Sequence, residues 1–138
     1  MAANTAPIFV KQGNLTPVRI ITANSNNSGS TGTLYDVVTA TIDGTRVDGI
    51  RFINAGTALV ASAATRINIF NTVGATIRIV GQVLMPAATR SATVLGATAI
   101  YTFDQPIVLK TGEKISVTST NWATTADDID ACAFAGDY

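Results

Sequence analysis

The stretch VVTATIDGTRVDGIRF, residues 37–52, decides the fold class. Apolar and small polar residues alternate through residues 34–42, which is the period-two pattern of a β-strand. Asp43-Gly44 then supplies the dipeptide favoured in a two-residue type I′ turn, and a new strand begins near Arg46. We therefore predict a β-hairpin across residues 34–54.

The returning strand of this hairpin, RVDGIRFIN at residues 46–54, breaks strict alternation. Val47 is out of phase with Ile50 and Phe52 unless the strand carries one extra residue. A β-bulge at Gly49 would supply the extra residue and would place all three apolar side chains on the core face. We predict a bulge at this position.

A second stretch, DQPIVLKTGEKISVTST at residues 104–120, shows the same pattern. Its apolar part at residues 107–109 is followed by a polar corner at Thr111-Gly112-Glu113. Ile115 and Val117 then alternate with hydroxyl side chains. The pattern predicts a second unit of strand, tight turn and strand.

Short segments rich in β-branched residues fill the rest of the chain, and no long 3.6-residue amphipathic pattern competes with them. They are separated by corners of Gly, Asn, Asp and Pro, which is typical of an antiparallel sandwich or barrel. The sequence predicts an all-β antiparallel β-sandwich of about eight to ten strands. Besides the strands at 34–42 and 46–54, strands are expected at residues 8–10, 16–22, 66–71, 76–84, 99–103, 107–109, 114–120 and 129–134.

Three connections, residues 23–32, 55–65 and 86–98, are longer than a hairpin needs. Because Greek-key and jelly-roll topologies send the chain across the end of a sandwich, these lengths favour a jelly-roll-like arrangement. We expect one such domain over residues 1–138. The first connection is expected to be polar and flexible, and the alanine-rich second one has room for a turn or two of helix. Residues 1–7 are either an extended arm laid across a neighbour or a terminus without fixed structure.

Composition indicates a chain whose surface is partly covered by other molecules. Hydrophobic residues make up 47% of the sequence and charged residues only 13%, about half the share of roughly 25% that is usual in globular proteins. Few charges remain to keep the outer surface solvated, so we expect contact with other copies or with a partner. A threonine-rich monomer is the alternative.

The charge pattern and the sequence ends give expectations about partners and location. Nine basic and nine acidic residues cancel and no basic run occurs, so binding to nucleic acid is not expected. The first ten residues lack the charged and apolar regions of a secretory signal, and no apolar run is long enough to span a membrane. Synthesis in a reducing cytoplasm is therefore expected. The single cysteine, Cys132, has no partner for an intrachain disulfide and is predicted to be a small buried apolar residue.

Side chains that carry catalysis are scarce. The sequence has no histidine and a single glutamate, Glu113, which removes the commonest general base and every Ser-His-Asp or Cys-His arrangement. No phosphate-binding or dinucleotide-binding motif occurs, so neither an enzyme nor a cofactor is expected. Asp127 and Asp128 offer carboxylate oxygens for a weak Ca²⁺ site, although a solvated corner before the last strand is the favoured interpretation.

Two kinds of side chain are candidates for recognition. Strand-borne arginines alternate with apolar neighbours and would point away from the core: Arg46, Arg51, Arg66 and Arg78. Arginine is enriched at protein interfaces, so these residues predict an interaction surface, the alternative being a solvated sheet face. Trp122 follows a strand, where its ring would pack in an interface or offer a stacking platform for a sugar.

Three segments carry a resemblance to a known family. They are VVTATIDGTRVDGIRF at residues 37–52, VLKTGEKISV at 108–117 and ACAFAGDY at 131–138. Together they resemble the small jelly-roll virion proteins of tailed bacteriophages that cement or decorate a capsid. The resemblance implies a homotrimer on the outer surface of the capsid that bridges neighbouring subunits of the major capsid protein. A head-fibre or tail-associated structural protein and a carbohydrate-binding module are the alternatives.

Overall fold

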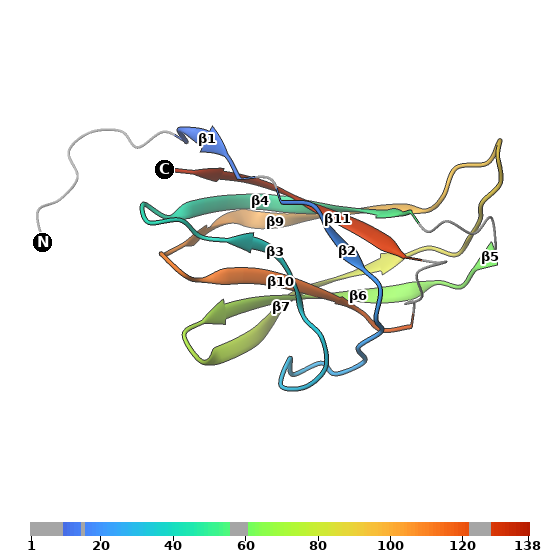
Figure 1. The fold of residues 1–138 in the computed structure, drawn as a ribbon, viewed down its shortest axis with the longest axis horizontal. Helices are drawn as coiled ribbons and strands as arrows, with labels where there is room; N and C mark the ends of the chain where they lie inside the picture. Colours follow the sequence, from blue (N-terminus) through green and yellow to red (C-terminus); the bar gives the residue numbers. More distant parts are fainter. Residues whose placement is uncertain (1–9, 15, 56–60, 122–127) are drawn as a thin grey trace, which may run out of the picture.

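The structure, a computed structural model, describes residues 10–14, 16–55, 61–121 and 128–138. The described residues form strands and turns but no helix, and two antiparallel sheets pack face to face as a β-sandwich (Figure 1). The all-β sandwich predicted from the alternation of apolar residues is confirmed.

Each of the two sheets is built from strands that are far apart in the sequence. The first, which we call sheet A, has the order β1-β11-β4-β9, with β2 also paired to β11; these strands are β1 (Gln12–Gly13), β2 (Val18–Ile20), β4 (Thr45–Asn54), β9 (Thr98–Leu109) and β11 (Ile129–Asp137). The second, sheet B, has the order β3-β10-β6-β7, formed by β3 (Tyr35–Thr39), β6 (Thr65–Val73), β7 (Thr76–Met85) and β10 (Lys114–Ser119).

The strand pairs are nested, which identifies a jelly roll. β2 pairs with β11, β3 with β10, β4 with β9 and β6 with β7, all antiparallel. The first half of the chain thus pairs with the second half as in one long hairpin. This long hairpin is wrapped into the sandwich by two further pairings, of β11 with β4 and of β10 with β6. Such rolled-up Greek keys make the eight-stranded jelly roll.

The two predicted hairpins are instead corners between the sheets, which corrects the sequence prediction. β3 lies in sheet B and β4 in sheet A, and β9 lies in sheet A whereas β10 lies in sheet B. Neither turn therefore joins strands that pair with each other. The turn at Asp43-Gly44 is also not of type I′, because only its glycine has a positive φ, of 95°, and type I′ needs two such residues.

The two corners lie side by side and are tied to each other. The backbone N–H of Ala40 donates to the carbonyl of Glu113, and the N–H of Gly112 donates to the carbonyl of Ala40. The hydroxyl of Thr111 donates to the carbonyl of Ile42 over 2.8 Å. Where the chain passes from one sheet to the other, backbone groups have no partner strand, and these hydrogen bonds satisfy them.

The one tight hairpin in the described residues joins β6 to β7. Val73 pairs with Thr76 across a two-residue loop, Gly74-Ala75. Gly74 has a φ of 59° and Ala75 does not have a positive φ, which fits a type II′ turn with glycine in its first central position.

The predicted bulge at Gly49 is confirmed. The register of β4 shifts between Val47 and Gly49 against both of its neighbours, so Asp48 is the extra residue. Val47, Ile50 and Phe52 are all fully buried. Opposite the bulge, residues 103–106 of β9 also interrupt the ladder, and therefore the two short strands predicted at 99–103 and 107–109 form one long edge strand.

The core fills the space between the sheets. Its largest fully buried apolar side chains come from both layers: Phe52, Ile20, Ile50, Ile67, Ile69, Met85, Leu109, Ile115 and Ile129. Burial of one such side chain stabilises the fold by about 1.5–3 kcal/mol. β-Branched residues dominate because they suit a pleated, buried surface.

The long connection from β2 to β3 covers part of the outer face of sheet B. Asn27 Oδ1 accepts hydrogen bonds from Arg66 and Asn68 on β6, and Gly29 lies against the side chains of Phe70 and Ile77. Phe70 is fully buried on this side. The loop that was expected to be flexible is therefore a cover for sheet B, and it runs along that layer in Figure 1.

The other two long connections meet at one end of the sandwich. β5 (Ala61–Ser62) lies in the connection that follows β4, and β8 (Ala88–Thr89) lies in the one that follows β7; these two short strands pair. Residues 56–60, where a turn of helix was considered, lie outside the described residues.

Candidate functional site: the outer face of sheet A

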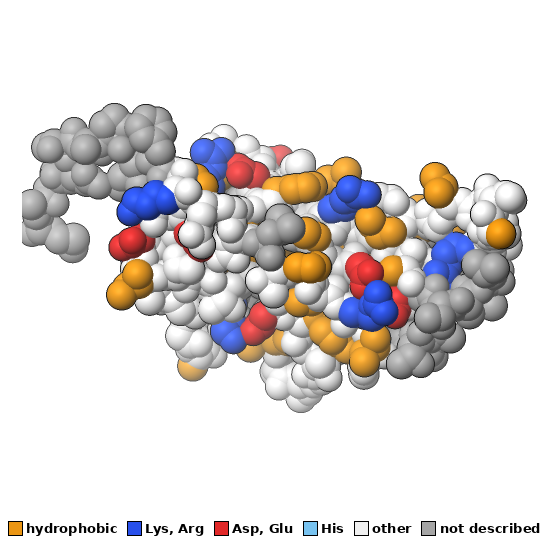
Figure 2. Space-filling model, turned by 45° about the horizontal axis from the view of Figure 1, so that its top comes forward, with side chains coloured by type: hydrophobic (Ala, Val, Ile, Leu, Met, Phe, Trp, Pro, Cys, Tyr) orange, Lys and Arg blue, Asp and Glu red, His pale blue; other side chains and the backbone are white. Residues whose placement is uncertain are grey.

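The outer face of sheet A carries large apolar side chains that no other described segment covers. Ile100 is 55% exposed, Val108 59% and Phe134 43%. Figure 2 shows hydrophobic side chains gathered beside basic ones on this side of the molecule. On sheet B the loop from β2 to β3 buries Phe70, although Leu84 and Ile79 stay exposed beside it.

The last strand is the clearest case of reversed packing. On β11 the inward positions hold Ile129 and the small residues Ala131 and Ala133, all fully buried, whereas Phe134 points outward. A strand made to be solvated on one face would place its largest apolar side chain inward. The arrangement of β11 is that of a strand with apolar contacts on both faces.

Antiparallel register places the outward side chains in rows across the sheet. One row runs Cys132, Arg51, Ile100, and the next runs Phe134, Gly49, Thr102. Directly opposed side chains lie about 4.5–5.5 Å apart at Cβ. Because Gly49 has no side chain, the ring of Phe134 has no cross-strand neighbour on that side.

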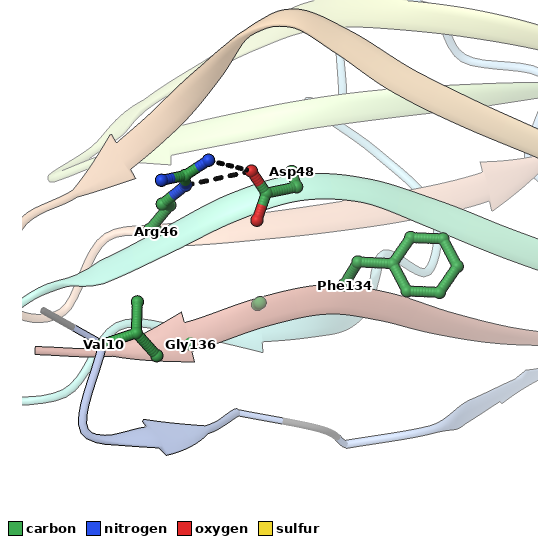
Figure 3. Close-up of a pocket in the computed structure, with 6 residues that line it drawn as sticks. Val10, Arg46, Asp48, Phe134 and Gly136 are labelled. Carbon is green, nitrogen blue, oxygen red and sulfur yellow. Dashed lines mark hydrogen bonds and ion pairs between the residues drawn. The ribbon is translucent and has the colours of Figure 1, made fainter.

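Two open hollows flank Phe134. One, of about 280 Å³, is lined mainly by apolar groups together with two charged residues: Pro17, Arg51, Ile53, Asp130, Ala131, Cys132 and Phe134. The other, of about 420 Å³, lies toward the start of the described chain and is lined by Val10, Arg46, Asp48, Phe134, Ala135 and Gly136. Figure 3 shows the ring of Phe134 projecting from β11 and Val10 beside Gly136.

Most charges on sheet A are paired within the face. Arg46 Nη2 lies 2.7 Å from Asp48 Oδ1, the pair drawn in Figure 3. Arg19 contacts Asp130 at 2.8 Å and Asp128 at 3.4 Å. The hydrogen bond from Arg19 to Asp130 and the charge of Asp128 raise the pKa of Arg19 above its ordinary value, so this guanidinium is charged at every pH at which the protein folds.

Two exposed charged residues of sheet A have no opposite charge among the described residues. Arg51 makes no ion pair or hydrogen bond there. Asp104, exposed on the interrupted part of β9, likewise pairs with no described cation. One cation and one anion are thus left to bind groups outside the described chain.

The structure divides the four arginines predicted as an interface. Arg46 and Arg51 lie on β4 and face outward from sheet A. Arg66 lies on β6 in sheet B and contacts Asn27 of the covering loop, and Arg78 on β7 donates to the carbonyl of Ile77. Trp122 lies outside the described residues.

The predicted weak cation site is only half described, because Asp127 lies outside the described residues. The carboxylate of Asp128 is buried, with Oδ2 beside the guanidinium of Arg19. In the part of the chain that the structure describes, no group of three or more His, Cys, Asp or Glu is placed to hold a metal ion.

Cys132 was expected to be buried, and it is instead half-buried on the outer face of sheet A. Its neighbours Ala131 and Ala133 point into the core, so alternation turns Cys132 outward. The same alternation in ACAFAGD, small residues inward and larger ones outward, is the sequence signal that would have identified Phe134 as a surface residue. Ile100 and Val108 carried no such signal, because their face depends on the register of β9.

No family model matches this chain. A search of curated proteins also finds no significant match. Within the described residues there is no helix that is long and apolar enough to cross a membrane.

Proposed function

We propose that this chain is a non-enzymatic structural protein of a virion, a cement or decoration protein that sits on the capsid surface and bridges neighbouring subunits of the major capsid protein. The jelly-roll sandwich supports this proposal because viral capsid proteins commonly use that fold. Fold alone does not assign function, so the argument needs a surface.

The observation that carries the proposal is the uncovered apolar face of sheet A, centred on Phe134. Large apolar side chains on one face, rimmed by arginines and paired charges, are the composition of a protein interface. They occur in a chain with few charges elsewhere on its surface. A protein whose function is to bind other proteins through this face would have both features, the exposed apolar side chains and the low charged fraction.

A rigid sandwich suits the cementing role physically. Its strands are held by long-range ladders, so the face moves as one body and a force on one edge is shared by the whole sheet. A cement protein needs such a body between two shell subunits, together with contact area rather than a reactive group. The homotrimer implied by the resemblance would multiply the attachment points, so that weak single contacts combine into strong binding.

The proposal is tested on particles produced from the genome that encodes the chain. Antibodies against the purified protein, coupled to gold, are applied to intact virions and observed by electron microscopy. We expect label over the head, in many copies per particle. Label confined to the tail or to fibres would assign the alternative structural role, and intact virions without the protein would contradict the proposal.

A second readout tests cementing itself. Particles made without the gene should release their DNA at a lower temperature than wild-type particles, as followed by a DNA-binding dye during heating. Adding the purified chain to the depleted particles should restore the release temperature. Equal release temperatures with and without the chain would show that it does not stabilise the head.

A further inference from the structure

We propose that copies of this chain bind one another through the outer face of sheet A, with Arg51 of one copy facing Asp104 of the next. The inference deepens the proposed function, on which it rests for its biological setting, by naming the surface that holds the oligomer together. Four observations carry it.

The first is the difference between the two layers. The outer face of sheet B is partly covered by the connection from β2 to β3, which buries Phe70 and holds Asn68 through Asn27. Leu84 and Ile79 stay exposed beside this cover. Sheet A has no such cover among the described residues, and its outward aromatic residue, Phe134, is 43% exposed. The chain thus buries the aromatic residue on one outer face and leaves the one on the other face to a partner.

The second is the charge pattern, which makes the face complementary to itself. Arg46 and Arg19 are matched on their own sheet by neighbouring carboxylates. Among the exposed charged residues of sheet A, Arg51 and Asp104 are the two that pair with no opposite charge within the described residues. Two copies satisfy each other's unmatched charges without any foreign group, and a closed ring of copies can do so at every interface.

The third is the position of Arg51. Register places it between Cys132 and Ile100, and it lines the apolar hollow beside Phe134. An ion pair formed there by a second copy would be partly shielded from water, where it is stronger than on an open surface. Arginine and aromatic residues at the centre of a contact are also the usual carriers of binding energy.

The fourth is area. The four strands β2, β11, β4 and β9 are 3, 9, 10 and 12 residues long. At about 3.3 Å per residue and about 4.8 Å between strands, they give a flat footprint of roughly 550 Å², against about 800 Å² per partner in a standard interface. The face is therefore large enough for self-association, at the weaker end of the stable range.

The test measures the mass of the purified full chain by light scattering behind a sizing column, over chain concentrations of roughly 1–200 µM. The wild type should exceed the 14.3 kDa of one chain, and a trimer would have three times that mass, about 43 kDa. Phe134→Ser and Arg51→Glu should each weaken association about tenfold or more. Leu84→Ser, which removes an apolar side chain that is 64% exposed on sheet B, is the matched control and should leave the mass unchanged.

Charge exchange tests the pairing itself. Arg51→Glu combined with Asp104→Arg should recover most of the mass that Arg51→Glu loses. Failure of the double variant to recover would overturn the Arg51–Asp104 pair. A wild type that stays monomeric throughout, or an oligomer that persists in Phe134→Ser and Arg51→Glu, would overturn the assignment of the face. Circular dichroism of each variant confirms that it remains folded.

These outcomes separate the inference from the proposed function. A monomer that still labels the heads of virions would assign the face to a shell protein, which overturns self-association and leaves the head location in place. An oligomer of the expected mass that is missing from virions would support self-association and overturn the location on the head.

Discussion

Gly49 shows how one residue sets the geometry of the exposed face. A Cβ built at this position would lie 2.5 Å from the carbonyl oxygen of Tyr101, and backbone cannot move aside as a flexible side chain can. The bulge that Gly49 allows keeps Val47 and Ile50 inward and leaves the space beside Phe134 open. The sequence alone predicted this bulge because the apolar pattern breaks at that point.

Gly49→Ala should therefore destabilise the fold by about 1–3 kcal/mol, since the new methyl group forces β4 and β9 apart. Urea unfolding at one fixed chain concentration measures this cost. Gly13→Ala is the control, because a Cβ there meets nothing within 4 Å. Equal stabilities of the two variants would contradict the close approach of the strands at Gly49.

A buried carboxylate near the chain end gives a second prediction at this scale. Asp137 Oδ1 accepts a hydrogen bond of 2.5 Å from the hydroxyl of Thr45, which is fully buried, and one of 2.9 Å from Asn14. Thr45→Val removes a donor while keeping the shape of the side chain. We expect Thr45→Val to lose about 1–3 kcal/mol in unfolding free energy. The control, Thr102→Val at an exposed position, should lose almost none. A Thr45→Val protein as stable as the wild type would show that the bond contributes nothing.

The elements show where prediction from sequence fails, and why. Asp43-Gly44 and Thr111-Gly112 carry real turn chemistry, and the chain does turn at both. Whether the strands on either side pair with each other depends on partners more than 40 residues away, because β3 pairs with β10 and β4 with β9. Local residues specify the bend, and only long-range pairing decides between a hairpin and a corner.

The same limit applies to the candidate surface. Alternation correctly turned Arg46 and Arg51 outward, but Arg66 also points away from the core on the other layer, and Arg78, next to the outward Ile77, lies on the opposite face of β7. Nothing in the local pattern says which sheet a strand will join. Phe134 was overlooked for the related reason that a phenylalanine in an apolar strand is most simply read as core.

The open side between β7 and β9 gives a prediction at the scale of elements. Tyr101 on β9 lies over Gly81 on β7, its hydroxyl donates to the carbonyl of Val80 over 3.3 Å, and its ring meets Phe103 edge to face with centroids 5.1 Å apart. The side chain thus connects the edge strands of the two sheets.

Tyr101→Ala should cost about 2–3 kcal/mol because it removes the ring that fills the space above Gly81. Tyr101→Phe keeps the ring and loses only a long hydrogen bond, so we expect a cost below about 1 kcal/mol. Thermal unfolding of both variants separates packing from hydrogen bonding. If the phenylalanine variant were as unstable as the alanine variant, the hydroxyl rather than the ring would hold the two edges.

The molecule as a whole is a sandwich in which a loop covers part of sheet B and the outer face of sheet A is the proposed assembly surface. The low charged fraction predicted that some surface would be covered, and the structure identifies a face suited to it. Composition could not supply the location, because the face is assembled from four strands that are scattered between residues 18 and 137.

The most direct measurement of this central claim uses the single cysteine as a probe. Cys132 lies in the middle of the outer face of sheet A, beside Arg51. The rate at which its thiol reacts with a chromogenic disulfide reagent is followed over a dilution series of the folded chain, with the urea-unfolded chain as the fully accessible reference. We predict that the rate falls several-fold as the wild type concentrates and that the rate in Arg51→Glu does not change with concentration. A wild-type rate that is the same at every concentration at which light scattering detects an oligomer would contradict the account, because the face would then be open in the assembled protein.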